Sequence, residues 1–320
     1  MSSRSKLIGV GTYLPEQVVT NADLEKRVDT SDAWIRERTG IVQRHLAAPH
    51  ETAAFMATEA ARGALAHAGI EAGVVDAILL ATSTPDQAFP ATAVRVQAAL
   101  GISHGFAFDL AAACSGFIYA LSVADALIRT GQVRTVLVIG SEVYSRIVDW
   151  SDRSTCVLFG DGAGAVVMQA GAVDGPGLLS THLHSDGSTG DLLYVDGAVG
   201  RRECSGFLRM NGREIFRHAV SKLAGAVDEA LAANGLSYAD IDWLVPHQAN
   251  KRIIDAMGKK LGLPPERVVV TVDRHANTSA ASIPLAFAEA VGDGRIKPGD
   301  LVLMEALGGG LTWGSALLRM

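Results

Sequence analysis

The sequence predicts an α/β fold built from two similar halves. Apolar runs that fit buried strands alternate with helical patterns along almost the whole chain. Hydrophobic residues make up 48% of the chain and charged residues 19%, which is typical of a well-buried globular protein. With 320 residues the chain is too long for one compact core, so we expect halves at 1–170 and 171–320.

The expected elements follow these runs in order. Buried strands are predicted at Val75–Ala81, Phe106–Ala112, Thr135–Gly140, Ala163–Gln169, Ile241–Val245, Val268–Val272 and Leu301–Ala306. Helices are predicted at Thr52–Ala68, Ala91–Leu100, Ser115–Thr130, Ile215–Asn234 and Lys251–Leu261. The least regular segment, Gly171–Met210, is expected to line or cover a site.

A unit of the first half recurs in the second. The helix end, glycine and strand of Leu65–Leu79 match those of Leu231–Val245 at an offset of 166 residues. The same offset aligns Val136 with Val302. A shared offset at separated places indicates a duplication, although any two helix–turn–strand units look somewhat alike.

Charge and hydropathy exclude several classes of function. The formal net charge of −6 gives no reason to expect nucleic-acid binding, which requires a basic face. No stretch reaches the ~18 apolar residues that a membrane span needs, and the first apolar run is too short for a signal peptide. We therefore expect a cytoplasmic protein. Three widely spaced cysteines also argue against a disulfide framework.

The glycine-rich segments do not match nucleotide-binding loops. Gly160–Gly164 and Gly308–Gly310 lack the Lys-Ser/Thr ending of a phosphate loop, and Gly9–Gly11 lacks a third glycine at the right distance. Gly308–Gly310 better suits a tight turn whose backbone approaches a substrate. His182 and His184 have no further ligand beside them, so no metal site is expected.

Cys114 is the candidate nucleophile, because it lies where a buried strand turns into a helix that is apolar nearly all round. Free backbone N–H groups at such a turn lower a thiol pKa and can bind an oxyanion. The alternative is a small core cysteine. Cys156 and Cys204 lack this setting and are interpreted as structural.

Two further polar residues follow predicted strands. His247 comes after Ile241–Val245, and Asn277 follows Val268–Val272. Ligand-binding residues gather at the carboxyl ends of strands in open α/β sheets, so both could meet Cys114. Alternatively, His247 is a hydrogen-bonded structural histidine and Asn277 caps the next helix.

Together these residues closely resemble the 3-oxoacyl-[acyl-carrier-protein] synthase III family, the initiating condensing enzymes of bacterial fatty-acid synthesis. The likeness runs nearly from end to end. It is carried by seven segments in order: Gly9–Pro15, Thr30–Ile41, Ala113–Phe117, Ser154–Gly164, Pro246–Asn250, Asn277–Pro284 and Gly308–Gly314.

The resemblance implies a thiolase-like five-layer α/β/α/β/α sandwich of two duplicated halves, usually a homodimer. It also implies the catalytic triad Cys114, His247 and Asn277, with an oxyanion hole from the backbone N–H groups of Cys114 and Gly309. Acetyl-CoA would acetylate Cys114, and a malonyl-loaded acyl carrier protein would supply the second substrate. No permanently bound cofactor is implied, since the coenzyme A thioester is a substrate.

The same resemblance assigns binding residues. Trp34 and Arg153 would sandwich the adenine of coenzyme A, which is physically sensible for an aromatic ring and a guanidinium. Thr30 and Arg38 would lie nearby. Phe89 and Phe159 would shape the acyl pocket, and Phe89, reaching across the dimer, would favour acetyl over longer primers. Arg252, Lys259 and Lys260 would dock the acidic carrier protein.

One departure is Leu307, where relatives often carry Phe, and it leaves the shape of the pocket open. Two other functions also stay open at this point. One is a specialised condensing or acyl-transfer enzyme of secondary metabolism, and the other is a cysteine thioester hydrolase. Hydrolysis has no obvious need for Asn277, whereas stabilisation of an enolate does.

Overall fold

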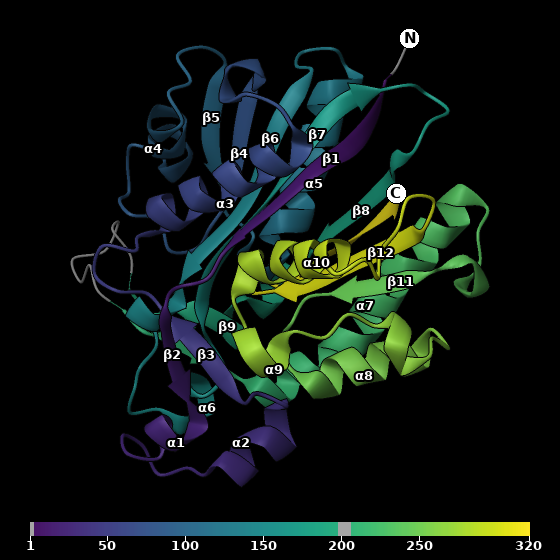
Figure 1. The fold of residues 1–320 in the computed structure, drawn as a ribbon. Helices are drawn as coiled ribbons and strands as arrows, with labels where there is room; N and C mark the ends of the chain where they lie inside the picture. Colours follow the sequence, from purple (N-terminus) through teal and green to yellow (C-terminus); the bar gives the residue numbers. More distant parts are fainter. Residues whose placement is uncertain (1–2, 198–205) are drawn as a thin grey trace.

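The computed structural model describes residues 3–197 and 206–320, and it contains two central sheets (Figure 1). The first sheet has the strand order β1-β7-β6-β4-β5 and the second the order β11-β12-β13-β8. The first comprises β1 (Arg4–Tyr13), β4 (Ala77–Ala81), β5 (Phe106–Leu110), β6 (Thr135–Val143) and β7 (Asp161–Gly171). The second comprises β8 (Gly177–Ser185), β11 (Trp243–Pro246), β12 (Leu301–Gly308) and β13 (Thr312–Arg319).

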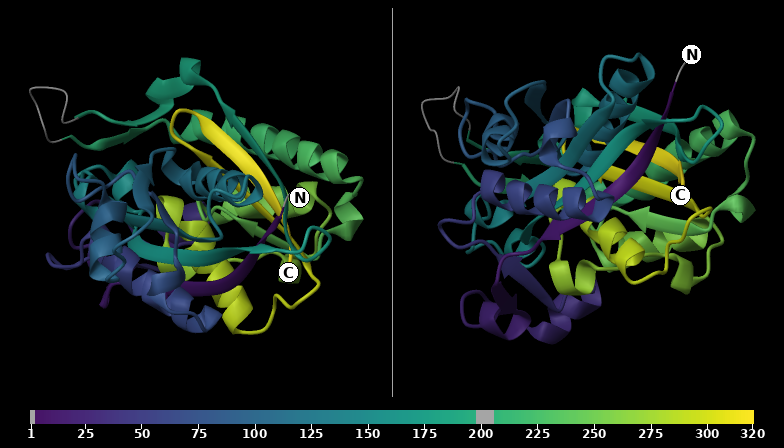
Figure 2. Two further views of the ribbon diagram at one scale, coloured as in Figure 1. Left: turned by 90° about the horizontal axis from the view of Figure 1, so that it is seen from above. Right: turned by 45° about the horizontal axis from the view of Figure 1, so that its top comes forward.

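Helices form the other three layers, as the view from above in Figure 2 shows. α3 (Ala53–Ala68) and α4 (Thr92–Ala99) cover the outer face of the first sheet. α5 (Gly116–Arg129) and α10 (Ser282–Gly292) lie between the two sheets. α7 (Gly212–Asn234) covers the outer face of the second sheet with α8 (Lys251–Lys260) beside it.

Shorter elements surround this sandwich. β2 (Gln17–Thr20) and β3 (Gln43–Leu46) pair beside α1 (Asn21–Leu24) and α2 (Asp32–Thr39) at the bottom of Figure 1. β9 (Leu193–Val195) and β10 (Leu208–Met210) form a hairpin. α6 (Arg153–Cys156) and α9 (Val272–His275) are single turns.

The two halves repeat each other in hydrogen-bond register. Ala77 pairs with Val136 in the first sheet, and Trp243 pairs with Val302 in the second, so both partners are shifted by the predicted 166 residues. The equivalent helices α3 and α7 also end in the same way. Each has a C-cap glycine in the left-handed conformation, and these glycines, Gly69 and Gly235, are again 166 residues apart. The duplicated architecture is thus confirmed, while the division at residue 170 stays a prediction.

The strand predicted at Val268–Val272 is wrong. Its only ladder contact is an isolated bridge from Val268 to Leu244. The backbone N–H groups of Thr271 and Val272 donate to Oε1 of Gln248, at 2.8 and 3.0 Å. Because this buried side chain satisfies the donors that a neighbouring strand would have satisfied, the chain turns into α9 instead of continuing the strand.

The glycines of β1 allow close packing. A Cβ atom at Gly11 would lie 2.2 Å from the carbonyl oxygen of Ala60, and one at Gly9 would lie 2.3 Å from that of Ala64. α3 can therefore rest directly on β1 only because these positions carry no side chain. No helix within the described ranges has the length and apolar character needed to cross a membrane.

Candidate active site

Cys114, His247 and Asn277 line one cavity of about 550 Å³. Each comes from a different part of the fold, namely the turn before α5, the end of β11 and the loop after α9. The wall also contains Leu193 and Met210 of the β9–β10 hairpin, which confirms that the segment Gly171–Met210 lines a site. That segment is more regular than expected, however, because it includes β8.

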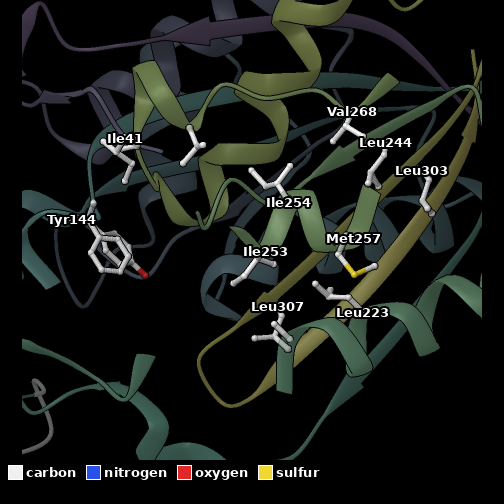
Figure 3. Close-up of a cluster of buried hydrophobic side chains, with 14 of the residues drawn as sticks. Ile41, Tyr144, Leu223, Leu244, Ile253, Ile254, Met257, Val268, Leu303 and Leu307 are labelled. Carbon is white, nitrogen blue, oxygen red and sulfur yellow. The ribbon is translucent and has the colours of Figure 1, made fainter. Parts of the chain in front are cut away.

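The hydrophobic cluster in Figure 3 includes residues that line this cavity. It brings Ile253 and Met257 of α8 together with Leu223 of α7 and Leu307 of β12. Ile253 and Leu307 also line the cavity. Part of the cavity wall thus belongs to a hydrophobic cluster that joins α7, α8 and β12.

Cys114 lies in a tight turn, Ala113–Ser115, directly before α5, and is only 3% exposed. The glycine run after β12 packs against it, because a Cβ at Gly308 would lie 2.6 Å from the backbone nitrogen of Cys114. Gly309 follows in the same turn, where a Cβ would meet the carbonyl oxygen of Leu193 at 2.7 Å. The missing side chain of Gly308 thus lets this turn approach the backbone of Cys114, and that of Gly309 lets it approach Leu193.

The thiol differs from the sequence-based expectation. Burial raises the pKa of Cys114 to about 12, and the hydrogen bond from Ser279 opposes this rise. A turn into a helix was expected to lower the pKa, whereas burial raises it. Burial therefore favours the neutral thiol over the thiolate before Cys114 reacts.

His247 directly follows β11, and its backbone N–H donates to the carbonyl of Glu305 at 2.8 Å. Its Nδ1 lies 2.6 Å from Oγ of Ser282, the first residue of α10. Burial lowers the pKa of His247 to about 3, so the imidazole is neutral. A neutral ring has one N–H and can donate a single hydrogen bond to a substrate.

Asn277 is placed by the other half of the chain. It forms a parallel bridge with Phe159, and its Oδ1 accepts the backbone N–H of Ser279 at 2.9 Å. With the carbonyl oxygen of its side chain occupied, the Nδ2 amide is the group left to donate a hydrogen bond. Asn277 thus makes a local capping contact and lines the cavity at the same time.

Unfavourable backbone conformations concentrate at these residues. Among the described residues, the non-glycine residues with positive φ are Ala113 (φ 45°), Ala276 (φ 58°) and Ser279 (φ 50°). They lie beside Cys114 or within two residues of Asn277. Such conformations cost about 1–3 kcal/mol each and persist where surrounding packing imposes them, which is common at functional sites.

A buried polar network that sequence reasoning missed lies behind the thiol. Ser279 donates to the Tyr144 hydroxyl at 2.9 Å and also contacts Cys114 and Glu142. Burial raises the pKa of Glu142 to about 7, while its hydrogen bond from the Thr84 hydroxyl, at 2.6 Å, acts in the opposite direction. The available signals were weak: Ser279 and Ser282 lie in the segment Asn277–Pro284, and Glu142 is a charge at the end of an apolar strand.

Of the four residues predicted for coenzyme A, two line the cavity and a third, Arg153, lies beside one of them. Trp34 and Arg38 line it, and the guanidinium carbons of Arg153 and Arg38 lie 4.8 and 4.9 Å from the Trp34 ring centroid. Arg153 also donates to the carbonyl of Asp29 at 2.9 Å. Thr30 does not line the cavity, and its buried Oγ1 has no partner among the described residues.

The remaining predicted residues divide into two groups. Phe159 and Arg252 line the cavity, and Arg252 stacks on Phe216 at 5.2 Å. Phe89 does not, because its side chain is 84% exposed on this chain. Lys259 and Lys260 are exposed at the other end of α8, roughly 10–12 Å along the helix from Arg252.

Cys156, His182 and His184, which were set aside from catalysis, do not line the cavity. Cys156 is buried and free. Cys204 lies outside the described residues. His182 and His184 both face Glu229, with the closer contact, 2.7 Å, made by His184 Nε2.

Comparisons with known proteins agree with this geometry. Residues 108–187 match the family model "3-Oxoacyl-[acyl-carrier-protein (ACP)] synthase III", and residues 231–320 match the model of its C-terminal part. The chain is 72% identical over 317 residues to beta-ketoacyl-[acyl-carrier-protein] synthase III of Acidiphilium cryptum, with 99% of each chain covered.

Two solved structures have the same fold as this chain. The 3-oxoacyl-[acyl-carrier-protein] synthase III of Aquifex aeolicus is 50% identical with a TM-score of 0.94, covering 99% of this chain and all of that one. The priming beta-ketosynthase of the R1128 polyketide pathway is 37% identical, also with a TM-score of 0.94, over 99% and 97%. The predicted thiolase-like architecture is thus confirmed. The chain belongs to the 3-oxoacyl-[acyl-carrier-protein] synthase III family, which are acyltransferase-type condensing enzymes of fatty-acid synthesis.

Proposed function

We propose that this chain condenses acetyl-CoA with malonyl-loaded acyl carrier protein through an acetyl-Cys114 intermediate. The observation that carries the proposal is the shared cavity, which a buried thiol, a neutral imidazole and a side-chain amide line together with Trp34 and Arg252. A nucleophile beside two neutral donors suits a reaction in which a thioester carbonyl becomes an enolate.

In the first half-reaction, the sulfur of Cys114 attacks the acetyl carbon of acetyl-CoA. The carbon–sulfur bond to coenzyme A breaks, and coenzyme A leaves as a thiol after taking up a proton equivalent to the one that Cys114 loses. The backbone N–H groups of Cys114 and Gly309 would bind the negative oxygen of the tetrahedral intermediate. The close approach of the Gly308–Gly309 turn to Cys114 supports this assignment.

In the second half-reaction, His247 and Asn277 donate hydrogen bonds to the thioester carbonyl of the malonyl group. The bond to its carboxylate breaks, carbon dioxide leaves, and the electron pair forms an enolate. The enolate carbon then attacks the acetyl carbon on Cys114, and the released thiolate takes a proton from solvent. The products are acetoacetyl-carrier protein, carbon dioxide and free enzyme.

The binding assignments extend this proposal to the surface. Trp34, Arg38 and Arg153 would hold coenzyme A, with Thr30 nearby. Arg252, Lys259 and Lys260 would bind the acidic carrier protein, which the exposed basic end of α8 supports. Phe159 would border the acyl group, and no permanently bound cofactor is required. We also keep the cytoplasm as the proposed location.

A homodimer is part of the same proposal. Phe89 is 84% exposed, and the half-exposed Phe106 lies on the edge strand β5, so the first half presents two aromatic side chains that a partner could cover. A partner subunit that covered Phe89 would bury it, and the ring would then restrict the acyl pocket to short straight primers. Faster turnover of branched or medium-chain acyl-CoA than of acetyl-CoA would contradict that restriction.

The test is product formation from acetyl-CoA and malonyl-carrier protein by wild type, Cys114→Ala and Cys156→Ala. Wild type and Cys156→Ala, whose buried cysteine lies outside the cavity, should both carry an acetyl mass in intact-protein spectra and release acetoacetyl-carrier protein. Cys114→Ala should do neither. Rapid release of free acetate by wild type, with no condensation product, would favour the hydrolase instead.

A further inference from the structure

Ser282 contacts the buried nitrogen of the catalytic imidazole. Its Oγ lies 2.6 Å from Nδ1 of His247, and the backbone N–H of Gln248 donates to the same oxygen at 3.2 Å. All three residues are buried, at 1%, 6% and 0% exposure respectively. These contacts belong to the first turn of α10 and the end of β11, so both partners are held by regular structure.

The number of available hydrogens decides which of the two atoms, Ser282 Oγ or His247 Nδ1, donates in this hydrogen bond. A serine hydroxyl has one hydrogen to donate and two lone pairs that accept. If Nδ1 carried the ring hydrogen, Oγ would accept from both Nδ1 and Gln248. The hydroxyl hydrogen of Ser282 would then have no acceptor among the described residues, and a buried unpaired donor is costly.

If Ser282 donates to Nδ1 instead, every polar group at this contact has a hydrogen-bond partner. Gln248 donates to Oγ, and the Ser282 hydroxyl donates to an unprotonated Nδ1. Since burial lowers the pKa of His247 to about 3, the neutral ring has a single N–H, which must then be on Nε2. Nε2 has no hydrogen-bond partner among the described residues, and His247 lines the cavity.

We propose that Ser282 is a positioning residue that holds His247 in the tautomer with its hydrogen on Nε2, directed to the substrate cavity. The catalytic consequence rests on the proposed function. In this tautomer His247 donates to the malonyl thioester carbonyl but cannot accept the Cys114 proton at Nε2. Acetylation of Cys114 should therefore depend little on Ser282, whereas decarboxylation of the malonyl group should depend on it strongly.

The first test needs no variant. Nitrogen-15 NMR of histidine-labelled wild-type protein distinguishes protonated from unprotonated ring nitrogens, and His247→Ala identifies the His247 signals among the nine histidines. We expect a protonated Nε2 and an unprotonated Nδ1 at neutral pH. A hydrogen on Nδ1 would overturn the proposal whatever the enzyme catalyses.

The second test separates the two half-reactions. Ser282→Ala should lower carbon dioxide release from malonyl-carrier protein about 10-fold or more and leave the rate of Cys114 acetylation within about 2-fold of wild type. Ser282→Thr, which restores a hydroxyl, should recover part of the loss. Ser315→Ala is the matched control, because Ser315 is equally buried but donates to the carbonyl of Ala226 on the side of α7, at 2.7 Å.

The outcomes remain distinguishable from failure of the proposed function. If wild type neither acetylates Cys114 nor releases carbon dioxide, the proposed function fails, and the NMR result still decides the tautomer. If wild type is active and Ser282→Ala lowers both half-reactions equally, or neither, the positioning role is wrong. An unfolded Ser282→Ala protein leaves the wild-type NMR measurement as the deciding one.

Discussion

The backbone N–H of Asn277 donates to the carbonyl oxygen of Leu158 at 2.9 Å, which ties a catalytic candidate of the second half to a loop of the first half. The backbone N–H of Gly160 donates to the carbonyl of Asn277 at 3.0 Å, so two backbone hydrogen bonds join Asn277 to this loop. The site is therefore completed by the docking of the two halves, and damage to this loop should reach Asn277.

Gly160→Ala tests that coupling. A Cβ at this position would lie 2.7 Å from the carbonyl oxygen of His275 and 3.2 Å from Cβ of the buried Arg44, so the loop must shift. We expect the free energy of unfolding in urea to fall by about 1–3 kcal/mol, together with slower condensation. Gly225→Ala is the control: nothing lies within 4 Å of its Cβ in α7, so stability should rise by up to about 1 kcal/mol. Equal activity of wild type and Gly160→Ala would contradict the coupling.

Ala276→Gly should stabilise the protein. Ala276 has φ 58° and ψ −159°, a conformation that only glycine adopts easily, directly before Asn277. Glycine removes this strain but makes the unfolded chain more flexible. We expect a net increase of about 1 kcal/mol in the free energy of unfolding, measured by thermal or urea unfolding. Ala280→Gly, at a buried position without positive φ, should instead lose stability. Destabilisation by both variants would show that the strain at Ala276 is smaller than the entropy cost of a more flexible unfolded chain.

Trp34→Ala and Arg153→Ala should weaken the use of acetyl-CoA. Adenine stacked between the two side chains needs roughly 7 Å from the ring to the guanidinium, twice an ordinary stacking contact, so Arg153 must move outward from its present 4.8 Å. We expect KM for acetyl-CoA to rise roughly 2- to 30-fold for each variant, with a smaller change in kcat. Arg36→Ala is the control on the same helix, since Arg36 pairs with Asp32 at 2.7 Å. An unchanged KM for both variants would place the nucleotide elsewhere.

Glu305→Gln should change how stability depends on pH. Burial raises the pKa of Glu305 to about 8, so the folded protein binds this proton more tightly than the unfolded chain does. The stabilisation from this group is thus complete below about pH 4.5 and is lost as the pH rises through about 8. Relative to wild type, Glu305→Gln should therefore gain on the order of 2–4 kcal/mol between pH 5 and pH 8 in urea unfolding.

The difference in the free energy of unfolding between wild type and Glu305→Gln cancels the contributions of the other titrating groups, because both proteins contain them. His247 acts in the opposite direction, since its lowered pKa makes the folded state lose stability as the pH falls from about 6.5 towards 3. Parallel stability curves for wild type and Glu305→Gln between pH 5 and 8 would mean that Glu305 does not titrate in this range.

The linear sequence was sufficient for the architecture, and it supplied the candidate reactive residues. Alternating strands and helices, the 166-residue offset and the seven family segments predicted the layered fold with Cys114, His247 and Asn277. These features are local patterns, so each can be recognised without knowing which distant residue it will contact. The strand predicted at Val268–Val272 was wrong because the side chain of Gln248, 23 and 24 residues before the two donors, supplies the hydrogen bonds that extended backbone was expected to make.

Only the tertiary structure decided the pKa of Cys114 and the contacts that position His247 and Asn277. Cys114 lies at a helix start that favours a thiolate, yet burial raises its pKa to about 12, because desolvation depends on everything packed around the sulfur. Likewise, no local pattern pairs Ser282 with His247 or Leu158 with Asn277. Ser282 and His247, 35 positions apart, meet only when the second half folds, and Leu158 and Asn277, 119 positions apart, meet only when the two halves pack together.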